Sequence, residues 1–336
     1  MGPSASPNTT GPVTPGTNRP APTEEPTMSQ HAVLGAPPTA PGARRPRAGE
    51  QHFVLRDDMP VGHPLFNDTP NLHDPLIFVE LIRRAGLHVG HRNFGVPAER
   101  PALFYRFALR LSDPAVWQDC AEGARLALEM RAEPTRTVAG VPRSLRLGGT
   151  LRLDGAEACT GSAELLFVTP TVARNHRATS RLAALARTPA DDGPRAGLRP
   201  AAPSLVGRCT PDSVVVSQPV RQGATLTTTV LVDPSHPVFF TGATDSVPGL
   251  LLVEALRQSA LLAVASDGAA PCPTALDRLS VHLRGHAELD LPLLCTARTE
   301  PGGIDGTGRR LTRILLTLRQ AGRTTAQAEA VTAEAG

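Results

Sequence analysis

The strongest constraint on the fold is a stretch of sequence that occurs twice. It reads HPLFNDTPNLHDPLIFVELIRRAGL over residues 63–87 and HPVFFTGATDSVPGLLLVEALRQSALLAVA over residues 236–265. Each copy has a His-Pro pair, an apolar pair, a polar turn, a proline and an apolar run containing Glu-x-x-Arg. The two Glu-x-x-Arg motifs, Glu80–Arg83 and Glu254–Arg257, are 174 positions apart. A repeat on this scale indicates two copies of one domain within the chain.

The apolar run of each copy predicts a long helix, over about residues 74–91 and 248–266. Proline stands near each expected helix start, where its missing N–H costs nothing. Apolar residues lie on nearly every side of the second helix, which indicates burial on most faces. Glu254 and Arg257 would share one face of that helix. Because burying a carboxylate is costly, the glutamate must be either paired or used in function.

Around each helix, the chain contains short runs with apolar alternation or β-branched residues. These runs predict strands at 51–55, 103–111, 124–132, 144–153 and 156–168, and at 213–217, 225–232, 275–286, 293–299, 311–318 and 325–332. An antiparallel sheet with one apolar face must cover that face, and one long helix can do so. The expected fold is therefore α+β, with a long central helix wrapped by a curved antiparallel sheet in each half.

Composition sets the domain boundaries. Residues 1–47 are rich in Pro, Thr, Gly and Ala, so we predict a disordered tail. Met28 lies within this tail, and one hypothesis is that translation starts there. A basic patch at 174–187 predicts a short helix, which could cover the domain junction or be solvated; we favour the solvated alternative. The expected units are a first domain at 48–170, a linker at 171–203 and a second domain at 204–336.

Charge and cysteine usage exclude several classes of function. The net charge of +3 is too small to indicate a nucleic-acid-binding protein. All 34 basic residues are arginine, so covalent chemistry through a lysine side chain is excluded. No run is long and apolar enough for a membrane span, and no signal-peptide core is visible. The five cysteines are an odd number without a CxxC motif, which favours free thiols in a reducing cytoplasm.

The sequence resembles the A-factor biosynthesis hotdog family, the γ-butyrolactone signal synthases of high-GC bacteria. The resemblance rests on HDPLIFVELIRRAGL and HRNFGVP in the first half, and on SLVGR and DSVPGLLLVEALRQSA in the second. It covers most of the chain after about residue 50 and implies a tandem hotdog fold. It also implies transfer of a β-ketoacyl group from acyl carrier protein to dihydroxyacetone phosphate, without a cofactor. The hotdog dehydratases of fatty acid synthesis are more distant relatives of this family.

Acyl transfer needs a general base and a stabilised oxyanion, and the second copy offers both. We predict Glu254 as the catalytic base and Arg257 as a residue that orients its carboxylate or holds the acceptor phosphate. Gly249 would let substrate approach the start of the second helix, where N–H groups are unpaired. The other residues predicted to bind substrate are Asp245, Glu80, Arg83 and His73. The alternative is a structural ion pair, which Glu-x-x-Arg often forms on a helix.

The chain departs from the family pattern at three histidine positions, which are Thr69, Gly242 and Ser246 here. These losses argue against a dehydratase. Two further hypotheses remain: another hotdog enzyme acting on acyl thioesters, such as a thioesterase, and a non-catalytic acyl-binding regulator. The spacing of the remaining histidines favours packing roles, and no metal site is expected. The two halves could pair within one chain or across a homodimer.

Overall fold

The computed structural model describes residues 33–35, 49–69, 74–118, 123–188, 197–242, 244–265 and 274–334. The helices of the described chain are α1 (Leu76–Arg92), α2 (Pro114–Gln118), α3 (Pro170–Leu185) and α4 (Gly249–Val264), with short 3-10 helices at Pro203–Val206 and Pro211–Ser213. Its strands are β1 (Val33–Gly35), β2 (Gln51–Asp58), β3 (Ala102–Leu111), β4 (Arg125–Val138), β5 (Val141–Leu153), β6 (Ala156–Phe167), β7 (Val220–Gln222), β8 (Thr225–Thr229), β9 (Thr274–Leu283), β10 (Leu293–Ile304), β11 (Arg310–Gln320) and β12 (Arg323–Glu334).

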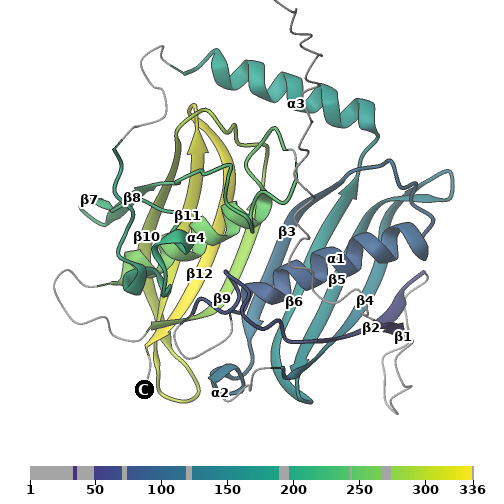
Figure 1. Ribbon diagram of the computed structural model, residues 1–336, viewed down its shortest axis with the longest axis horizontal. Coiled ribbons are helices and arrows are strands. Elements are labelled where there is room, and N and C mark those ends of the chain that lie inside the picture. The colour runs from purple at the N-terminus through teal and green to yellow at the C-terminus, as the bar shows by residue number, and fades with distance from the viewer. Residues whose placement is uncertain are drawn as a thin grey trace, which may run out of the picture.

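The described strands form one 12-stranded antiparallel sheet in the order β1-β2-β4-β5-β6-β3-β9-β12-β11-β10-β8-β7. The two halves join where β3 pairs with β9, with Phe107 opposite Val281 and Leu109 opposite Leu279. Figure 1 shows that α1 and α4 lie on the same side of this sheet, each across its own half. The two halves therefore pair within a single chain.

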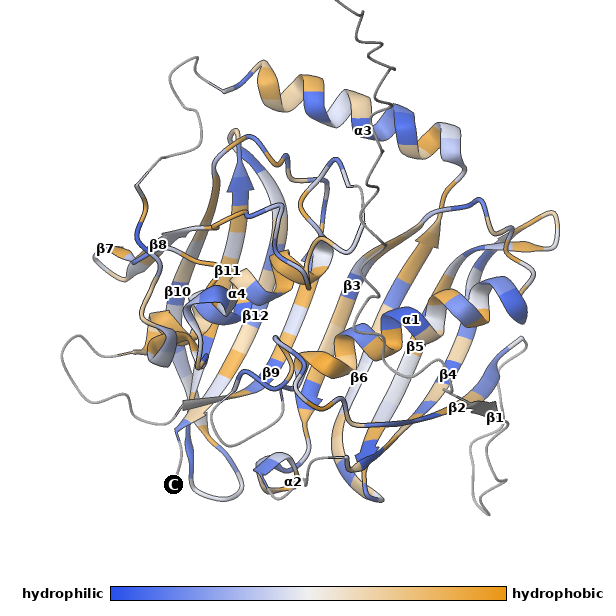
Figure 2. Ribbon diagram, viewed as in Figure 1, coloured by the Kyte–Doolittle hydropathy of each residue, from blue (hydrophilic) through white to orange (hydrophobic). Residues whose placement is uncertain are grey.

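Each long helix buries an apolar face against its sheet. All residues from Leu251 to Ala263 of α4 are buried, and α1 is buried along one side. Figure 2 shows the matching alternation of hydrophobic and hydrophilic residues along the strands. A Cβ at Gly86 of α1 would collide with Leu147 and Leu165, so glycine here lets the helix lie close to β5 and β6. The prediction of one long helix against an antiparallel sheet in each half is confirmed.

Two expectations about the connecting segments are wrong. Residues 213–217 form no named strand, because two of their backbone groups bind the side chain of Gln258. Its amide nitrogen donates to the carbonyl of Ser213, and its amide oxygen accepts from the N–H of Val215. The helix of the linker, α3, is not simply solvated, since Arg177 and Arg181 form ion pairs with other segments.

The predicted tail and its boundaries fall mostly outside the described residues. Met28 also lies outside them. Val33–Gly35, within the segment for which we predicted disorder, forms β1 and pairs with β2. Among the described residues, none of the helices is long and apolar enough to cross a membrane.

Candidate functional site

The two copies of the repeated stretch meet crosswise between the halves. Each long helix brings its Glu-x-x-Arg pair to the polar turn that precedes the other helix. Glu254 of α4 connects through Arg208 to Asp74, at the end of the first turn. Glu80 of α1 lines a cavity together with Ser246 of the second turn. The fold therefore has two related junctions, each built from the helix of one half and the turn of the other.

The repeated histidines hold the two turns in the same way. Nδ1 of His63 accepts hydrogen bonds from the N–H groups of Leu65 and Phe66, both at 3.2 Å. Nδ1 of His236 accepts them from the residues two and three positions further on, at 3.2 and 3.4 Å. Burial lowers the pKa of both rings, although nearby carboxylates oppose this effect. Because Nδ1 is an acceptor, each neutral ring carries its proton on Nε2.

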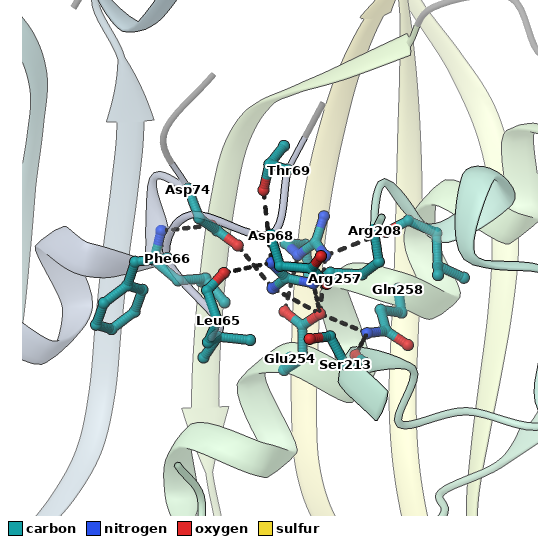
Figure 3. A network of polar contacts seen from close by, with 12 residues as sticks. Leu65, Phe66, Asp68, Thr69, Asp74, Arg208, Ser213, Glu254, Arg257 and Gln258 are labelled. Carbon is teal, nitrogen blue, oxygen red and sulfur yellow. Dashed lines mark hydrogen bonds and ion pairs between the residues drawn. The ribbon is translucent and has the colours of Figure 1, made fainter. Parts of the chain in front are cut away.

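The junction at Glu254 is closed by a buried network, the closed cluster of Asp74, Arg208, Glu254, Arg257 and Gln258 (Figure 3). Oε1 of Glu254 lies 2.9 Å from Nε and 2.8 Å from Nη2 of Arg208. Arg257 donates to both carboxylate oxygens, each at 2.8 Å. Nη2 of Arg208 also lies 2.6 Å from Oδ2 of Asp74. Two carboxylates and two guanidinium groups thus balance each other inside the protein.

The remaining polar atoms of the closed cluster bind backbone groups. Gln258 donates from Nε2 to the carbonyl of Ser213 at 2.7 Å, and Arg257 donates to the carbonyl of Val206 at 3.1 Å. Burial by itself would raise the pKa of the Glu254 carboxyl, but the two arginines outweigh this effect and lower it. The cluster is therefore an ionised network of ion pairs that connects the two halves.

The structure thus brings Glu254 and Arg257 together, but not at the cavity that Glu80 lines. The Glu254 side chain is 0% exposed, and the described residues that line the cavity include neither of the two. Arg257 orients the carboxylate, which was one of the two roles considered for it. A general base must reach the proton that it removes. Glu254 is completely buried and does not line the cavity, so the geometry favours the structural alternative for this pair.

The other junction contains a cavity of about 820 Å³. Its walls come from α1, the beginning of β3, the turn before α4, the end of β9 and, through His176, α3. Much of the lining is apolar, namely Phe66, Val79, Ala102, Leu103, Phe104, Leu166, Pro237, Val238, Phe239, Val247, Pro248, Leu250, Leu252, Val253 and Leu283. An apolar cavity with a few polar groups is the usual form of a small-molecule site.

Glu80 and Arg83, predicted to bind substrate, both line this cavity. Arg83 donates to the carboxylate of Glu80 through Nε at 2.7 Å and through Nη2 at 2.6 Å. This hydrogen bonding raises the pKa of Arg83 and keeps its guanidinium charged. The pair is more open than its counterpart in α4, since the side chain of Glu80 is 18% exposed and that of Arg83 is 43% exposed.

The start of α4 also lines the cavity, through Pro248, Gly249 and Leu250. Among the described residues, no side chain caps this helix start. By contrast, Asp74 accepts a hydrogen bond from the N–H of Leu76 at 2.8 Å at the start of α1. The first N–H groups of α4 therefore remain available to an oxygen of a ligand. A Cβ at Gly249 would make only an ordinary contact within the protein, so packing alone does not require glycine.

The other predicted positions are distributed over both junctions. Asp245 lies beside α3, where its carboxylate is 3.3 Å from Nε of Arg177, and it is not among the described residues lining the cavity. At the three departures from the family pattern, Ser246 lines the cavity, Gly242 does not, and Thr69 accepts a 3.5 Å hydrogen bond from Arg208. His73 lies outside the described residues.

Sequence reasoning missed the contribution of the linker helix. Arg177 of α3 donates to the buried carboxylate of Glu288, with Nη2 at 2.7 Å, and also binds the backbone carbonyl of Asp245. Arg181 donates to Glu288 at 2.7 Å and to Asp290 at 2.9 Å. These bonds attach α3 to the turn that leads into α4. The arginine repetition in this segment was visible in the sequence, but its acidic partners lie far along the chain.

Sequence reasoning also assigned no role to Arg208, the last residue of the SLVGR motif. Its side chain is fully buried and joins the two halves. The only local signal is Gly207, whose φ of 65° places it in the left-handed region that favours glycine. This turn directs the following arginine into the closed cluster.

The model of the A-factor biosynthesis hotdog domain matches residues 43–169 and 190–334, one segment in each half. The chain belongs to the A-factor biosynthesis hotdog family, and its fold is a tandem hotdog. It is 30% identical to the 2-oxo-3-(phosphooxy)propyl 3-oxoalkanoate synthase of Streptomyces coelicolor, over 82% of each chain. The enzyme of the same name from Streptomyces griseus is 30% identical over 78% of this chain and 81% of its own. An acyl-ACP thioesterase from Bacteroides thetaiotaomicron has a similar structure, with a TM-score of 0.47 at 10% identity over 83% of this chain and 97% of its own.

Proposed function

We propose that this protein is an acyltransferase that moves a β-ketoacyl group from a thioester to the hydroxyl of dihydroxyacetone phosphate. Relatives over most of the chain are named 2-oxo-3-(phosphooxy)propyl 3-oxoalkanoate synthases, a name that describes the ester of these two components. The single observation that carries the proposal is the cavity in which the carboxylate of Glu80 and the uncapped start of α4 face the same space. Acyl transfer requires both kinds of group.

Glu80 takes the role of general base in this proposal. Its carboxylate removes the proton of the acceptor hydroxyl as the oxygen attacks the thioester carbonyl. The bidentate bond from Arg83 fixes the orientation of the carboxylate, while each oxygen keeps a second lone pair for the acceptor. The proton then passes to the departing thiolate, so that one C–S bond breaks, one C–O bond forms and the base is regenerated.

The N–H groups at the start of α4 receive the oxyanion. The helix dipole adds positive character at this point, and the surrounding apolar walls strengthen its effect. The acyl chain lies along the apolar lining, to which Leu252 and Val253 of α4 and Leu166 of β6 contribute. The donor is a thioester on acyl carrier protein, as the family resemblance implies, and the cysteine usage favours the cytoplasm as its location.

The test is mass spectrometry of the purified protein with a β-ketoacyl thioester, with and without dihydroxyacetone phosphate. We expect a phosphate-bearing ester only in the presence of the acceptor. Free β-keto acid in both tubes would instead identify a thioesterase. Thioester binding without any product would identify a non-catalytic acyl-binding protein.

Two variants test whether the reaction takes place in the cavity. Glu80→Gln keeps the size of the side chain but removes the base, so ester formation should fall by about 10²- to 10⁴-fold. Glu99→Gln is the matched control, because Glu99 is exposed and lies outside the cavity lining. Equal rates in the two variants would remove Glu80 from the mechanism.

A further inference from the structure

We propose that Arg84 and Arg284 form a phosphate-binding subsite in the cavity and recognise the phosphate group of the acceptor. This inference rests on the proposed acyl transfer and names the residues that select its acceptor. Arg84 belongs to α1 in the first half, and Arg284 follows β9 in the second half. Both line the same cavity, so the subsite is shared between the two halves of the chain.

The charge balance of the cavity supports this assignment. Its described lining contains three arginines, Arg83, Arg84 and Arg284, and one carboxylate, Glu80. Glu80 is already bound through both oxygens by Arg83. Two positive charges are therefore left without a compensating carboxylate among the described lining residues. A cavity with this excess attracts anions and disfavours cations.

Arg84 and Arg284 differ in their pairing from other arginines near the two junctions. Arg177, Arg208 and Arg257 each form ion pairs with buried carboxylates. By contrast, the side chains of Arg84 and Arg284 form neither an ion pair nor a hydrogen bond with any described residue. Both arginines are exposed and line the cavity, where a ligand can reach them. Guanidinium groups bind phosphate oxygens well because their planar donors fit two oxygens at once.

A neighbouring histidine reports the same positive field. His282 lines the cavity two residues before Arg284. Burial is the largest cause that lowers the pKa of His282, the charges of Arg106 and Arg284 lower it further, and the carboxylate of Glu164 opposes them. The ring is therefore neutral near pH 7 and can share a hydrogen bond with an anionic ligand, without adding a further charge to this wall.

The position of Arg84 relative to Glu80 favours the phosphate of the acceptor as the group that the subsite binds. The two residues are four positions apart on α1, so they are neighbours on one helix face, about one turn apart. In dihydroxyacetone phosphate, the free hydroxyl and the phosphate lie at opposite ends of a three-carbon chain. A hydroxyl at Glu80 thus places the phosphate near Arg84. The phosphodiester of a carrier protein's pantetheine arm is the other source of this chemistry, and the experiment must separate the two.

The test compares dihydroxyacetone phosphate with dihydroxyacetone as acceptor, using a β-ketoacyl N-acetylcysteamine thioester that contains no phosphate. In Arg84→Gln and Arg284→Gln we expect kcat/KM for dihydroxyacetone phosphate to fall by about 10- to 100-fold, the usual effect of losing a hydrogen bond to a charged group. The rate with dihydroxyacetone should stay within about twofold of wild type by the same reasoning. Arg319→Gln is the control, because Arg319 is exposed on β11, outside the cavity lining.

Direct binding of inorganic phosphate, measured by isothermal titration calorimetry, separates this subsite from the reaction. We expect wild type and the Arg319→Gln control to bind phosphate, and both cavity variants to bind it at least tenfold more weakly. If wild type forms no ester yet shows this binding pattern, acyl transfer fails and the subsite stands. Unchanged phosphate binding in both cavity variants would overturn the subsite. A loss seen only with a phosphopantetheine thioester would overturn its assignment to the acceptor.

Discussion

Replacing Glu254 by alanine should destabilise the folded protein strongly, because its carboxylate neutralises two buried arginines. Arg208 would retain Asp74 as a partner, but Arg257 would lose both of its bonds to a carboxylate. Arg257 is only 6% exposed, so water cannot replace the lost oxygens. The variant would therefore leave the buried guanidinium group of Arg257 without its hydrogen-bonded carboxylate.

The magnitude follows from the burial of the pair. Breaking a buried ion pair by removing one partner typically costs about 3–5 kcal/mol. Glu80→Ala removes the equivalent pair in the first half, where Arg83 is 43% exposed and water can solvate its charge. Such an exposed pair is worth about 1 kcal/mol or less. The two substitutions change the same residue type at equivalent positions, so they form a matched pair.

The assay is equilibrium unfolding in guanidinium chloride, followed by circular dichroism, on wild type, Glu254→Ala and Glu80→Ala. We expect the free energy of unfolding to fall by at least 2 kcal/mol more in Glu254→Ala than in Glu80→Ala, given the two ranges above. A Glu254→Ala protein as stable as wild type that forms no ester would refute the structural role. It would return Glu254 to the position of catalytic base.

Three further predictions concern other parts of the fold. Arg177→Ala should lower the free energy of unfolding by about 1.5–3 kcal/mol, because it removes bonds to the buried Glu288, whereas Arg174→Ala, at an exposed arginine on the same helix face, should be neutral in the same unfolding assay. Burial by itself would raise the pKa of Glu288, but Arg177 and Arg181 outweigh this effect and lower it. The contribution of Glu288 to stability is therefore complete above pH ~5 and declines as the pH falls through the lowered pKa. The stability of Glu288→Gln, measured by unfolding from pH ~6 to ~3, should vary less with pH than that of wild type. Gly161→Ala should cost about 1–3 kcal/mol in thermal unfolding, because its Cβ would collide with the backbone of β3, while Gly306→Ala has open space around it and should cost less.

Much of the fold follows from periodicity in the sequence. The apolar runs place α1 and α4 within about two residues of their observed bounds, since a buried helix needs apolar residues on most faces. The alternating runs locate most strands in both halves of the sheet, because residues on one face of a strand recur at every second position. The pairing of β3 with β9 was not predictable, because it depends on contacts between residues far apart in the chain.

The candidate site was predictable only in part. The repeat identifies two equivalent Glu-x-x-Arg pairs, and nothing in either copy shows which pair is accessible. That difference arises from Arg208, which lies outside both copies and fills the junction at Glu254. The motif that contains Arg208 was visible, but its partner Asp74 is close only after the two halves have paired. We placed the base in the second copy, whose helix is apolar on nearly every side, and that apolar character reflects its deeper burial.

The closed cluster and the cavity together suggest a division of roles between the halves. The repeat provides two junctions of common design, and one of them connects the domains while the other keeps space for a ligand. In this proposal, the two equivalent Glu-x-x-Arg pairs have different roles. Glu254 and Arg257 stabilise the fold in the closed cluster, whereas Glu80 and Arg83 take part in the reaction at the cavity. The loss of the family histidines at Gly242 and Ser246 then affects the junction that contains Glu80, since Ser246 lines its cavity.

The most direct test of this division is the single-turnover rate of ester formation by Glu80→Gln, measured against wild type at equal concentrations of folded protein. The donor is a β-ketoacyl thioester and the acceptor is dihydroxyacetone phosphate. We expect the rate to fall by about 10²-fold or more, with the free energy of unfolding within about 1 kcal/mol of wild type. A Glu80→Gln protein that forms the ester at the wild-type rate would contradict the assignment of the chemistry to this cavity.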